Sequence, residues 1–211
     1  AKHLKINVRE SMSALDIKNN LLGVCDQMYL FGPGDDTTVC VLKAVKPKKV
    51  KLFTGPPSHK EDDAKVVHEL MTNADIRIVS GGTTSQIVAR ELGVEVKSST
   101  EIYDKEVPPI AYIHGINLVT EGVLTLSKTI DRLKSLSKSL DSNIFKAKDG
   151  ASQMAKLLYS ASHIKLLVGR SLNIANAEIS FQRDLELRLH VIGELEKILV
   201  KLGKIVTIEY Y

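Results

Sequence analysis

The chain is poor in aromatic side chains and in net charge. It contains no tryptophan, its aromatic residues make up 5% of the sequence, and its formal net charge is only +4. Proteins that bind nucleic acids typically combine a basic face with aromatic side chains that stack on bases, so nucleic acid is not expected as a partner. Lysines gather at residues 46–51 and 128–148, and we interpret them as a linker and solvated helix faces.

Cysteine is nearly absent as well. Cys25 and Cys40 lack the Cys-x-x-Cys spacing and have no histidine close by in the sequence, which argues against a zinc site. Two cysteines in a chain without a secretion signal suit a reducing compartment. We therefore expect a cytoplasmic protein in which both thiols are small core residues.

Long apolar runs are also missing. No stretch approaches the roughly 20 apolar residues that span a bilayer, and no cleavable signal opens the chain, so no membrane segment is expected here. The sequence begins Ala1-Lys2-His3, which has the look of part of a longer protein. With 211 residues and 44% apolar content, the chain can hold one large domain, or one domain and a fragment of another.

The most informative motif is residues 34–42, GDDTTVCVL. An acidic pair at a turn, followed by alternating β-formers, is typical of a metal-ligand loop that leads into a buried strand. An approximate helical stripe over residues 13–28 precedes it, and a strand is expected at residues 37–45.

This order of helix, acidic turn and strand resembles the end of the catalytic domain in the stage II sporulation protein E family. These are bacterial metal-dependent serine/threonine phosphatases of the protein phosphatase 2C type, which act on phosphoproteins in signalling. The resemblance implies that Asp35 binds one of two Mn²⁺ or Mg²⁺ ions in the intact enzyme. The family's other metal-binding acids have no counterpart here. Residues 1–45 are therefore expected to be a catalytically inactive fragment of the phosphatase domain without a metal of its own.

Residues 46–211 resemble the region that follows the phosphatase domain in some members of this family. Three stretches carry the resemblance: residues 80–93 (SGGTTSQIVARELG), 115–126 (GINLVTEGVLTL) and 203–211 (GKIVTIEYY). The resemblance implies a phosphatase neighbour but no activity for this region. We expect a regulatory or ligand-binding domain.

Short apolar runs alternate with helical patterns after a Lys-Pro-Lys-Lys break at residues 46–49. We expect strands at 50–54, 75–80, 94–96, 111–113, 164–168 and 206–210, and helices at 61–72, 86–92, 120–136, 150–162 and 184–202. Gly93 is a natural helix C-cap and Asp149 a natural N-cap. Because parallel strands need crossover connections, this alternation predicts an α/β fold with a mostly parallel sheet flanked by helices. Two small α/β lobes, divided near residues 136–148, are the alternative.

A glycine turn separates the second expected strand from its helix. It consists of Gly81, Gly82, Thr83, Thr84 and Ser85. Backbone N–H groups at a helix N-terminus, with hydroxyl groups beside them, can bind an anion. The turn is neither a Walker A loop, since the lysine is missing, nor a GxGxxG motif. The alternative is an ordinary tight turn with a threonine N-cap.

Other polar residues follow expected strands, and in an open parallel sheet such loops gather at one edge, where ligands bind. The residues expected to line this crevice beside the glycine turn are Asn117, Thr120, Glu121, Arg170 and Asn173. A small anionic or amide-bearing ligand would suit Arg170 and the turn. The alternative is that these are solvated loops with local side-chain turns.

Three functions fit these patterns. The first is a regulatory module that binds a small ligand or a protein and controls the phosphatase domain. The second is an independent enzyme acting on a phosphorylated substrate, for which His114, Glu121 and Asp104 are the candidate reactive groups. The third is a homodimerisation module that uses the apolar faces of the helices at 120–136 and 184–202. The domain order and the lack of a complete catalytic constellation favour the first.

Overall fold

The computed structural model describes the chain except for residues 1–7, 10, 11, 13, 33, 139–145 and 172–179. The chain divides into two compact units, Ala1–Lys46 and Pro47–Tyr211. The described strands all belong to the second unit, which therefore holds the entire sheet.

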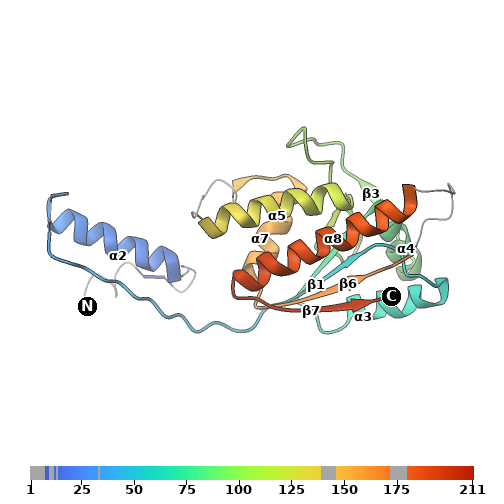
Figure 1. Cartoon of the computed structure of the whole chain (residues 1–211), viewed down its shortest axis with the longest axis horizontal. Helices are drawn as coiled ribbons and strands as arrows, with labels where there is room; N and C mark the ends of the chain where they lie inside the picture. The colour runs from blue at the N-terminus through green and yellow to red at the C-terminus, as the bar shows by residue number, and fades with distance from the viewer. Residues whose placement is uncertain (1–7, 10–11, 13, 33, 139–145, 172–179) are drawn as a thin grey trace. The chain divides into compact units, whose positions relative to one another are not determined.

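The smaller unit consists of a helix and an extended segment (Figure 1). The helix α2, Ala14–Met28, confirms the one expected at residues 13–28. The strand expected at residues 37–45 is wrong, because residues 34–48 have no regular secondary structure. A strand needs a neighbour to accept and donate its backbone hydrogen bonds. The described part of this unit offers none, so its β-forming sequence stays extended.

Pro47–Tyr211 contains a sheet of seven described strands in the order β3-β4-β5-β2-β1-β6-β7. Five of them run parallel: β1 Lys49–Thr54, β2 Ile76–Ser80, β5 Leu118–Thr120, β6 His163–Val168 and β7 Ile205–Tyr210. Two short strands, β3 Lys97–Ser98 and β4 Ala111–Tyr112, add an antiparallel edge. The predicted α/β fold with a mostly parallel sheet is confirmed. The strand expected at residues 94–96 is wrong, because β3 begins only at Lys97.

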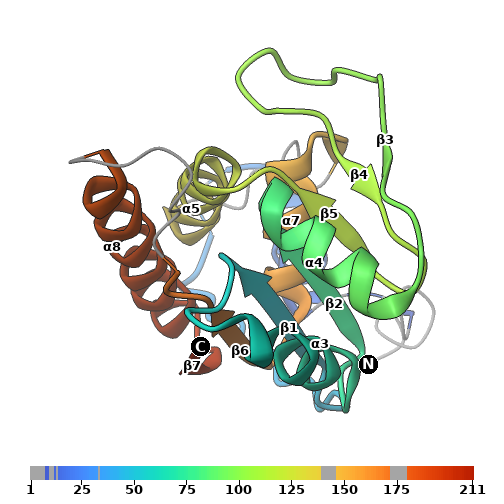
Figure 2. The same ribbon diagram turned by 90° about the vertical axis from the view of Figure 1, so that its right-hand side faces the viewer.

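Helices cover both faces of the sheet (Figure 2). On one face lie α3, Asp63–Met71, with the short 3₁₀ helix η1, Lys60–Asp62, before it, and α4, Gly82–Leu92. On the other face lie α5, Val123–Lys138, α7, Gly150–Ser160, and α8, Ser180–Lys201. Side chains alternate along each strand, so Leu52 of β1 joins the core under α5, α7 and α8, while Phe53 joins the core under α3 and α4.

The two long helices use their apolar faces inside the domain. Leu126 and Leu133 of α5, and Ile192 and Leu195 of α8, are fully buried in one core. These are the faces that the sequence offered for dimerisation, and they are already covered. Among the described helices, none combines the length and the apolar character that a membrane crossing requires.

Three helix starts differ from expectation. The helix expected at residues 184–202 begins earlier, because α8 starts at Ser180. The helix expected at residues 120–136 begins later, because residues 118–120 form β5 and α5 starts at Val123. The helix expected at 86–92 begins earlier, because Gly82 is already the first residue of α4. The expected caps are confirmed: Gly93 ends α4 with a left-handed φ of 65°, and the Asp149 carboxylate accepts a hydrogen bond from the Ser152 N–H at 2.9 Å.

The sheet order locates a site. Across the sheet, the parallel strands follow the order β5, β2, β1, β6 and β7. The chain therefore adds β2 and β5 on one side of β1, and then adds β6 and β7 on its other side. The direction of winding reverses between β1 and β6. In open α/β sheets, ligands bind outside the carboxyl ends of the strands at such a reversal. Here these ends are Thr54 and Val168, which are partners in the strand register.

Candidate functional site

Each of the four central parallel strands is followed within two residues by a glycine. These are Gly55 after β1, Gly81 after β2, Gly122 after β5 and Gly169 after β6. Gly55 and Gly81 have positive φ angles of 78° and 120°, which side chains rarely adopt. At the carboxyl ends of these strands, the backbone therefore carries no side chain at these four positions.

Gly55, Gly81 and Gly122 line a cavity of about 100 Å³, which we call the glycine pocket. Its walls are the chain after β1, the turn after β2, the start of α5 and one side chain of α8: residues 54–56, 80–84, 122, 123 and 188. Arg188 is the single charged residue among these described lining residues. Its Nη1 donates a hydrogen bond to the Gly169 carbonyl oxygen at 3.1 Å. The guanidinium group therefore adds positive charge beside the glycines.

The N-terminus of α4 forms one wall of the glycine pocket. The N–H groups of Gly82, Thr83 and Thr84 have no partner within the helix, because the first turn lacks preceding carbonyls. The N-cap residue Gly81 supplies no side-chain cap. Its carbonyl oxygen instead accepts from both the N–H and the hydroxyl of Ser85, at 2.9 and 2.8 Å. The turn is thereby held rigidly while its N–H groups stay open.

Thr84 is the unusual residue of this wall. Its side chain is buried, with the residue 1% exposed, yet it lines the glycine pocket. Its Oγ1 lies 3.0 Å from the position that a β-carbon on Gly81 would take. Within the part of the chain that the structure describes, this hydroxyl has no hydrogen-bond partner. A hydroxyl that lines a cavity without a protein partner can donate a hydrogen bond to a group bound there.

A second cavity of about 200 Å³ adjoins the first at Gly82, and we call it the Glu121 pocket. Its lining combines apolar residues (Val96, Pro109, Ile110, Ala111 and Val119) with the polar residues Ser85, Gln86, Ser98, Thr120 and Glu121. The Glu121 backbone is fixed because its carbonyl oxygen accepts from the Ser80 hydroxyl at 2.8 Å. Both carboxylate oxygens of Glu121 lie 4.0 Å from the position of a β-carbon on Gly82.

The structure brings most of the predicted site residues together. Gly81, Gly82, Thr83 and Thr84 line the glycine pocket. Ser85, Thr120 and Glu121 line the Glu121 pocket, although Thr120 is buried and its hydroxyl bonds to the Glu121 carbonyl oxygen at 3.0 Å.

Two predicted residues do not join them, and a third cannot be placed. Asn117 lies near the amino-terminal ends of the strands, opposite the pockets. Its side-chain oxygen accepts a hydrogen bond of 2.8 Å from the N–H of Arg77, at the start of β2. Arg170 lines neither pocket: its guanidinium lies 5.5 Å from the centre of the Tyr210 ring. Asn173 lies outside the described residues.

Arg188 is the site residue that the sequence did not reveal. It lies on α8, 19 positions after its hydrogen-bond partner Gly169. No motif surrounds it, and a helical pattern alone does not tell which strand end an arginine reaches. The expected cationic residue was Arg170, and the structure assigns that place to Arg188 instead.

The candidate reactive groups of the enzyme hypothesis do not converge. His114 precedes β5 and Glu121 follows it, so the two lie at opposite ends of that strand. Asp104 forms an ion pair with Arg132 at 3.0 Å. These three candidate groups therefore do not form one catalytic constellation.

The family resemblance implies a metal ligand at Asp35, which lies exposed in the smaller unit. Its carboxylate accepts a hydrogen bond from the Asp36 N–H at 2.9 Å. In the described residues, no group of three or more histidine, cysteine, aspartate or glutamate side chains could hold a metal ion. Since Mg²⁺ and Mn²⁺ need several oxygen ligands, the described residues do not fit a two-metal phosphatase centre.

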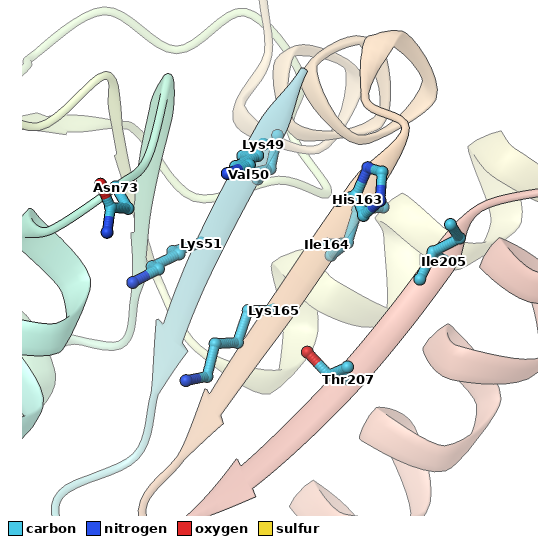
Figure 3. A pocket seen from close by; sticks show the side chains of 9 residues that line it. All are labelled: Lys49, Val50, Lys51, Asn73, His163, Ile164, Lys165, Ile205 and Thr207. Carbon is cyan, nitrogen blue, oxygen red and sulfur yellow. The ribbon is translucent and has the colours of Figure 1, made fainter. Parts of the chain in front are cut away.

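Another cavity, of about 180 Å³, lies over β1, β6 and β7 toward their N-terminal ends (Figure 3). Lys51 and Lys165 are register partners on the same face of the sheet. Glu69 and Glu209 balance their charges: Glu69 Oε1 lies 2.5 Å from Lys51 Nζ and 2.8 Å from Lys165 Nζ, and Glu209 Oε2 lies 2.6 Å from Lys165 Nζ. Hydrogen bonds from Lys165 and then Lys51 hold the pKa of Glu69 below its usual value. This cavity is lined by a satisfied ion network and is a weaker candidate.

The chain matches no known family model, no curated protein sequence and no solved structure. The glycine pocket and the Glu121 pocket are therefore the main structural indications of its function.

Proposed function

We propose that residues 47–211 form a regulatory domain that binds a small anionic ligand in the glycine pocket and controls a neighbouring phosphatase domain. The open N–H groups at the start of α4 carry the proposal, together with the Thr84 hydroxyl that lines the pocket without a hydrogen-bond partner in the described residues. A helix N-terminus has an effective charge of about +0.5 and binds anions through its free N–H groups. Arg188 contributes a guanidinium group to the lining of the same pocket.

The phosphatase part of the proposal rests on the motif at residues 34–42 and on uncovered apolar side chains. Leu30, Phe31 and Leu42 are 87%, 80% and 94% exposed. Such a concentration of exposed apolar residues is typical of a surface that another protein segment covers. In the proposed parent phosphatase, that segment would be the catalytic sheet. It would pair with residues 37–45, and its acids would share the Mn²⁺ or Mg²⁺ ions with Asp35.

The parent would then act on phosphoproteins in the bacterial cytoplasm. Both described cysteines, Cys25 and Cys40, are free thiols, which supports a reducing compartment. In this arrangement the ligand of the regulatory domain would report a metabolic state to the phosphatase.

A thermal-shift experiment on the full chain tests ligand binding. Gly82 is the best position to block, because a β-carbon there meets no atom closer than 4.0 Å and the fold tolerates it. Gly193 of α8, where a β-carbon meets nothing within 4 Å, is the matched control. We expect inorganic phosphate or phosphorylated metabolites to raise the Tm of the wild type and of Gly193→Val, but not of Gly82→Val. No stabilisation of the wild type, or equal stabilisation of all three, would refute the proposal.

A further inference from the structure

The glycine pocket and the Glu121 pocket have opposite charges and share one wall. Arg188 is the single charged residue among the described residues that line the first, and Glu121 is its counterpart in the second. Gly82 belongs to both linings, and because it has no side chain, nothing of that residue separates the two cavities. A ligand that filled both cavities would pass over Gly82, with Arg188 on one side and Glu121 on the other.

The donors of the glycine pocket fit a phosphate group better than a carboxylate. The three N–H groups of residues 82–84 and the Thr84 hydroxyl offer four donors around one small volume. A phosphomonoester presents three terminal oxygens and a double negative charge, whereas a carboxylate presents two oxygens. Thr84 is the independent sign that a bound group completes this wall, because the residue is only 1% exposed, lines the cavity and has no hydrogen-bond partner for its hydroxyl among the described residues.

The Glu121 pocket requires hydrogen-bond donors from the ligand. An ionised carboxylate is an acceptor only, and the Glu121 side chain has no hydrogen bond or ion pair within the described part of the chain. Hydroxyl groups of a sugar ring are suitable donors, and the apolar residues Val96, Pro109 and Ile110 can pack against the carbon face of such a ring. The Glu121 pocket has about twice the volume of the glycine pocket, so a ring fits in it more readily than in the glycine pocket.

We infer that the ligand is a phosphomonoester of a hydroxyl-bearing ring, with its phosphate at the start of α4 and its hydroxyl groups on the Glu121 carboxylate. The inference rests on the proposed regulatory function and specifies its ligand. A free sugar phosphate and a nucleoside monophosphate share this chemistry. The carboxylate beside an anion site selects against free inorganic phosphate, because it repels an anion that brings no donors with it.

Isothermal titration calorimetry on the full chain tests the inference with inorganic phosphate, ribose 5-phosphate and adenosine monophosphate. We expect ribose 5-phosphate to bind at least about tenfold more tightly than inorganic phosphate, since hydrogen bonds to a charged group are worth about that factor. Glu121→Gln is expected to remove most of this preference without weakening phosphate itself. Glu95→Gln, which changes an exposed carboxylate at the other end of α4, is the control and should bind as the wild type does.

Thr84→Val provides a second readout. It keeps the shape of the buried side chain and removes the hydroxyl, so it is expected to weaken all three phosphate compounds by about fivefold. Tighter binding of adenosine monophosphate than of ribose 5-phosphate would assign a nucleotide, and the reverse order a sugar phosphate.

The outcomes separate the two proposals. Equal affinity for ribose 5-phosphate and inorganic phosphate, or an unchanged preference in Glu121→Gln, would overturn the inference and leave anion binding intact. The absence of binding by every phosphate compound would overturn both the inference and the proposed function.

Discussion

The carbonyl oxygen of Pro56 lies 2.1 Å from the position that a β-carbon on Gly169 would occupy. The chain segments after β1 and β6 therefore touch through backbone alone, at the point where the sheet reverses its winding. Backbone hydrogen bonds fix this contact: the Gly169 N–H donates to the Thr54 oxygen at 2.9 Å, and the Ser171 N–H donates to the Pro56 oxygen at 3.0 Å.

Gly169→Ala should consequently destabilise the fold by about 3 kcal/mol, since neither backbone segment can move without losing these hydrogen bonds. Urea unfolding measures the change. Gly193→Ala is the control, because its β-carbon has open space and alanine favours a helix by about 1 kcal/mol over glycine. Similar stabilities of the two variants would contradict the close approach of the two segments.

The last two residues, Tyr210 and Tyr211, are expected to contribute very different amounts to the unfolding free energy. Tyr211 is 7% exposed and packs in the core beneath α3 and α4, whereas Tyr210 is 47% exposed. Tyr211→Ala should cost about 3 kcal/mol of unfolding free energy. Tyr210→Ala should cost less than about 1 kcal/mol, mainly the loss of its contact with Arg170. Chemical denaturation of both variants checks this, and equal losses would show that the end of β7 is packed differently.

The ion network on β1, β6 and β7 predicts a pH dependence. The pKa of Glu69 is lowered by hydrogen bonds from Lys165 and Lys51. A carboxyl group with a lowered folded-state pKa stabilises the protein fully above its unfolded value, and this stabilisation is lost as the pH falls through the folded-state pKa. Wild-type stability should therefore fall between about pH 5 and pH 3 more steeply than that of Glu69→Gln.

At pH 7, Glu69→Gln should lower the unfolding free energy by about 2 kcal/mol, because Lys51 is mostly buried and would lose its partner. Glu106→Gln, which removes an exposed ion pair with Lys128, should cost less than about 0.5 kcal/mol. Parallel pH profiles for the wild type and Glu69→Gln would rule out this role for Glu69.

Hydrogen exchange tests the extended segment of the smaller unit. The amides of residues 37–45 lack strand partners and should exchange almost as fast as in an unfolded chain, whereas those of Leu52 and Phe53 should be among the slowest. Strong protection of residues 37–45 in the full chain would mean that the strand expected from the sequence does form in solution.

Sequence patterns predicted the main strands well for a physical reason. β1, β2, β6 and β7 each have five or six residues, with enough apolar side chains to be recognised between helices. β5 escaped notice because Leu118–Thr120 is too short for an alternating pattern. It forms because it pairs in register with residues 78–80 of β2, a contact that no local sequence signal contains.

That one missed strand explains the main error at the site. With a strand expected only at residues 111–113 and a helix from residue 120, the residues between them were expected to form one loop after a strand, and Asn117 was placed at the same end of the sheet as Glu121. β5 divides this loop, so Asn117 lies before the strand and Glu121 after it. The glycine turn was predictable because two glycines after a strand are a local signal, whereas Arg188 reaches the pocket from a distant helix and required the three-dimensional structure.

Amide chemical shifts of the ¹⁵N-labelled full chain during a titration with ribose 5-phosphate test the central claim most directly. The account predicts saturable shifts of the Gly82, Thr83 and Thr84 amide signals, because those N–H groups would bind the phosphate. Thr84→Val should weaken the same response. Unmoved signals at these three residues, or shifts that grow linearly and are spread over surface lysines, would contradict a ligand site at the glycine pocket.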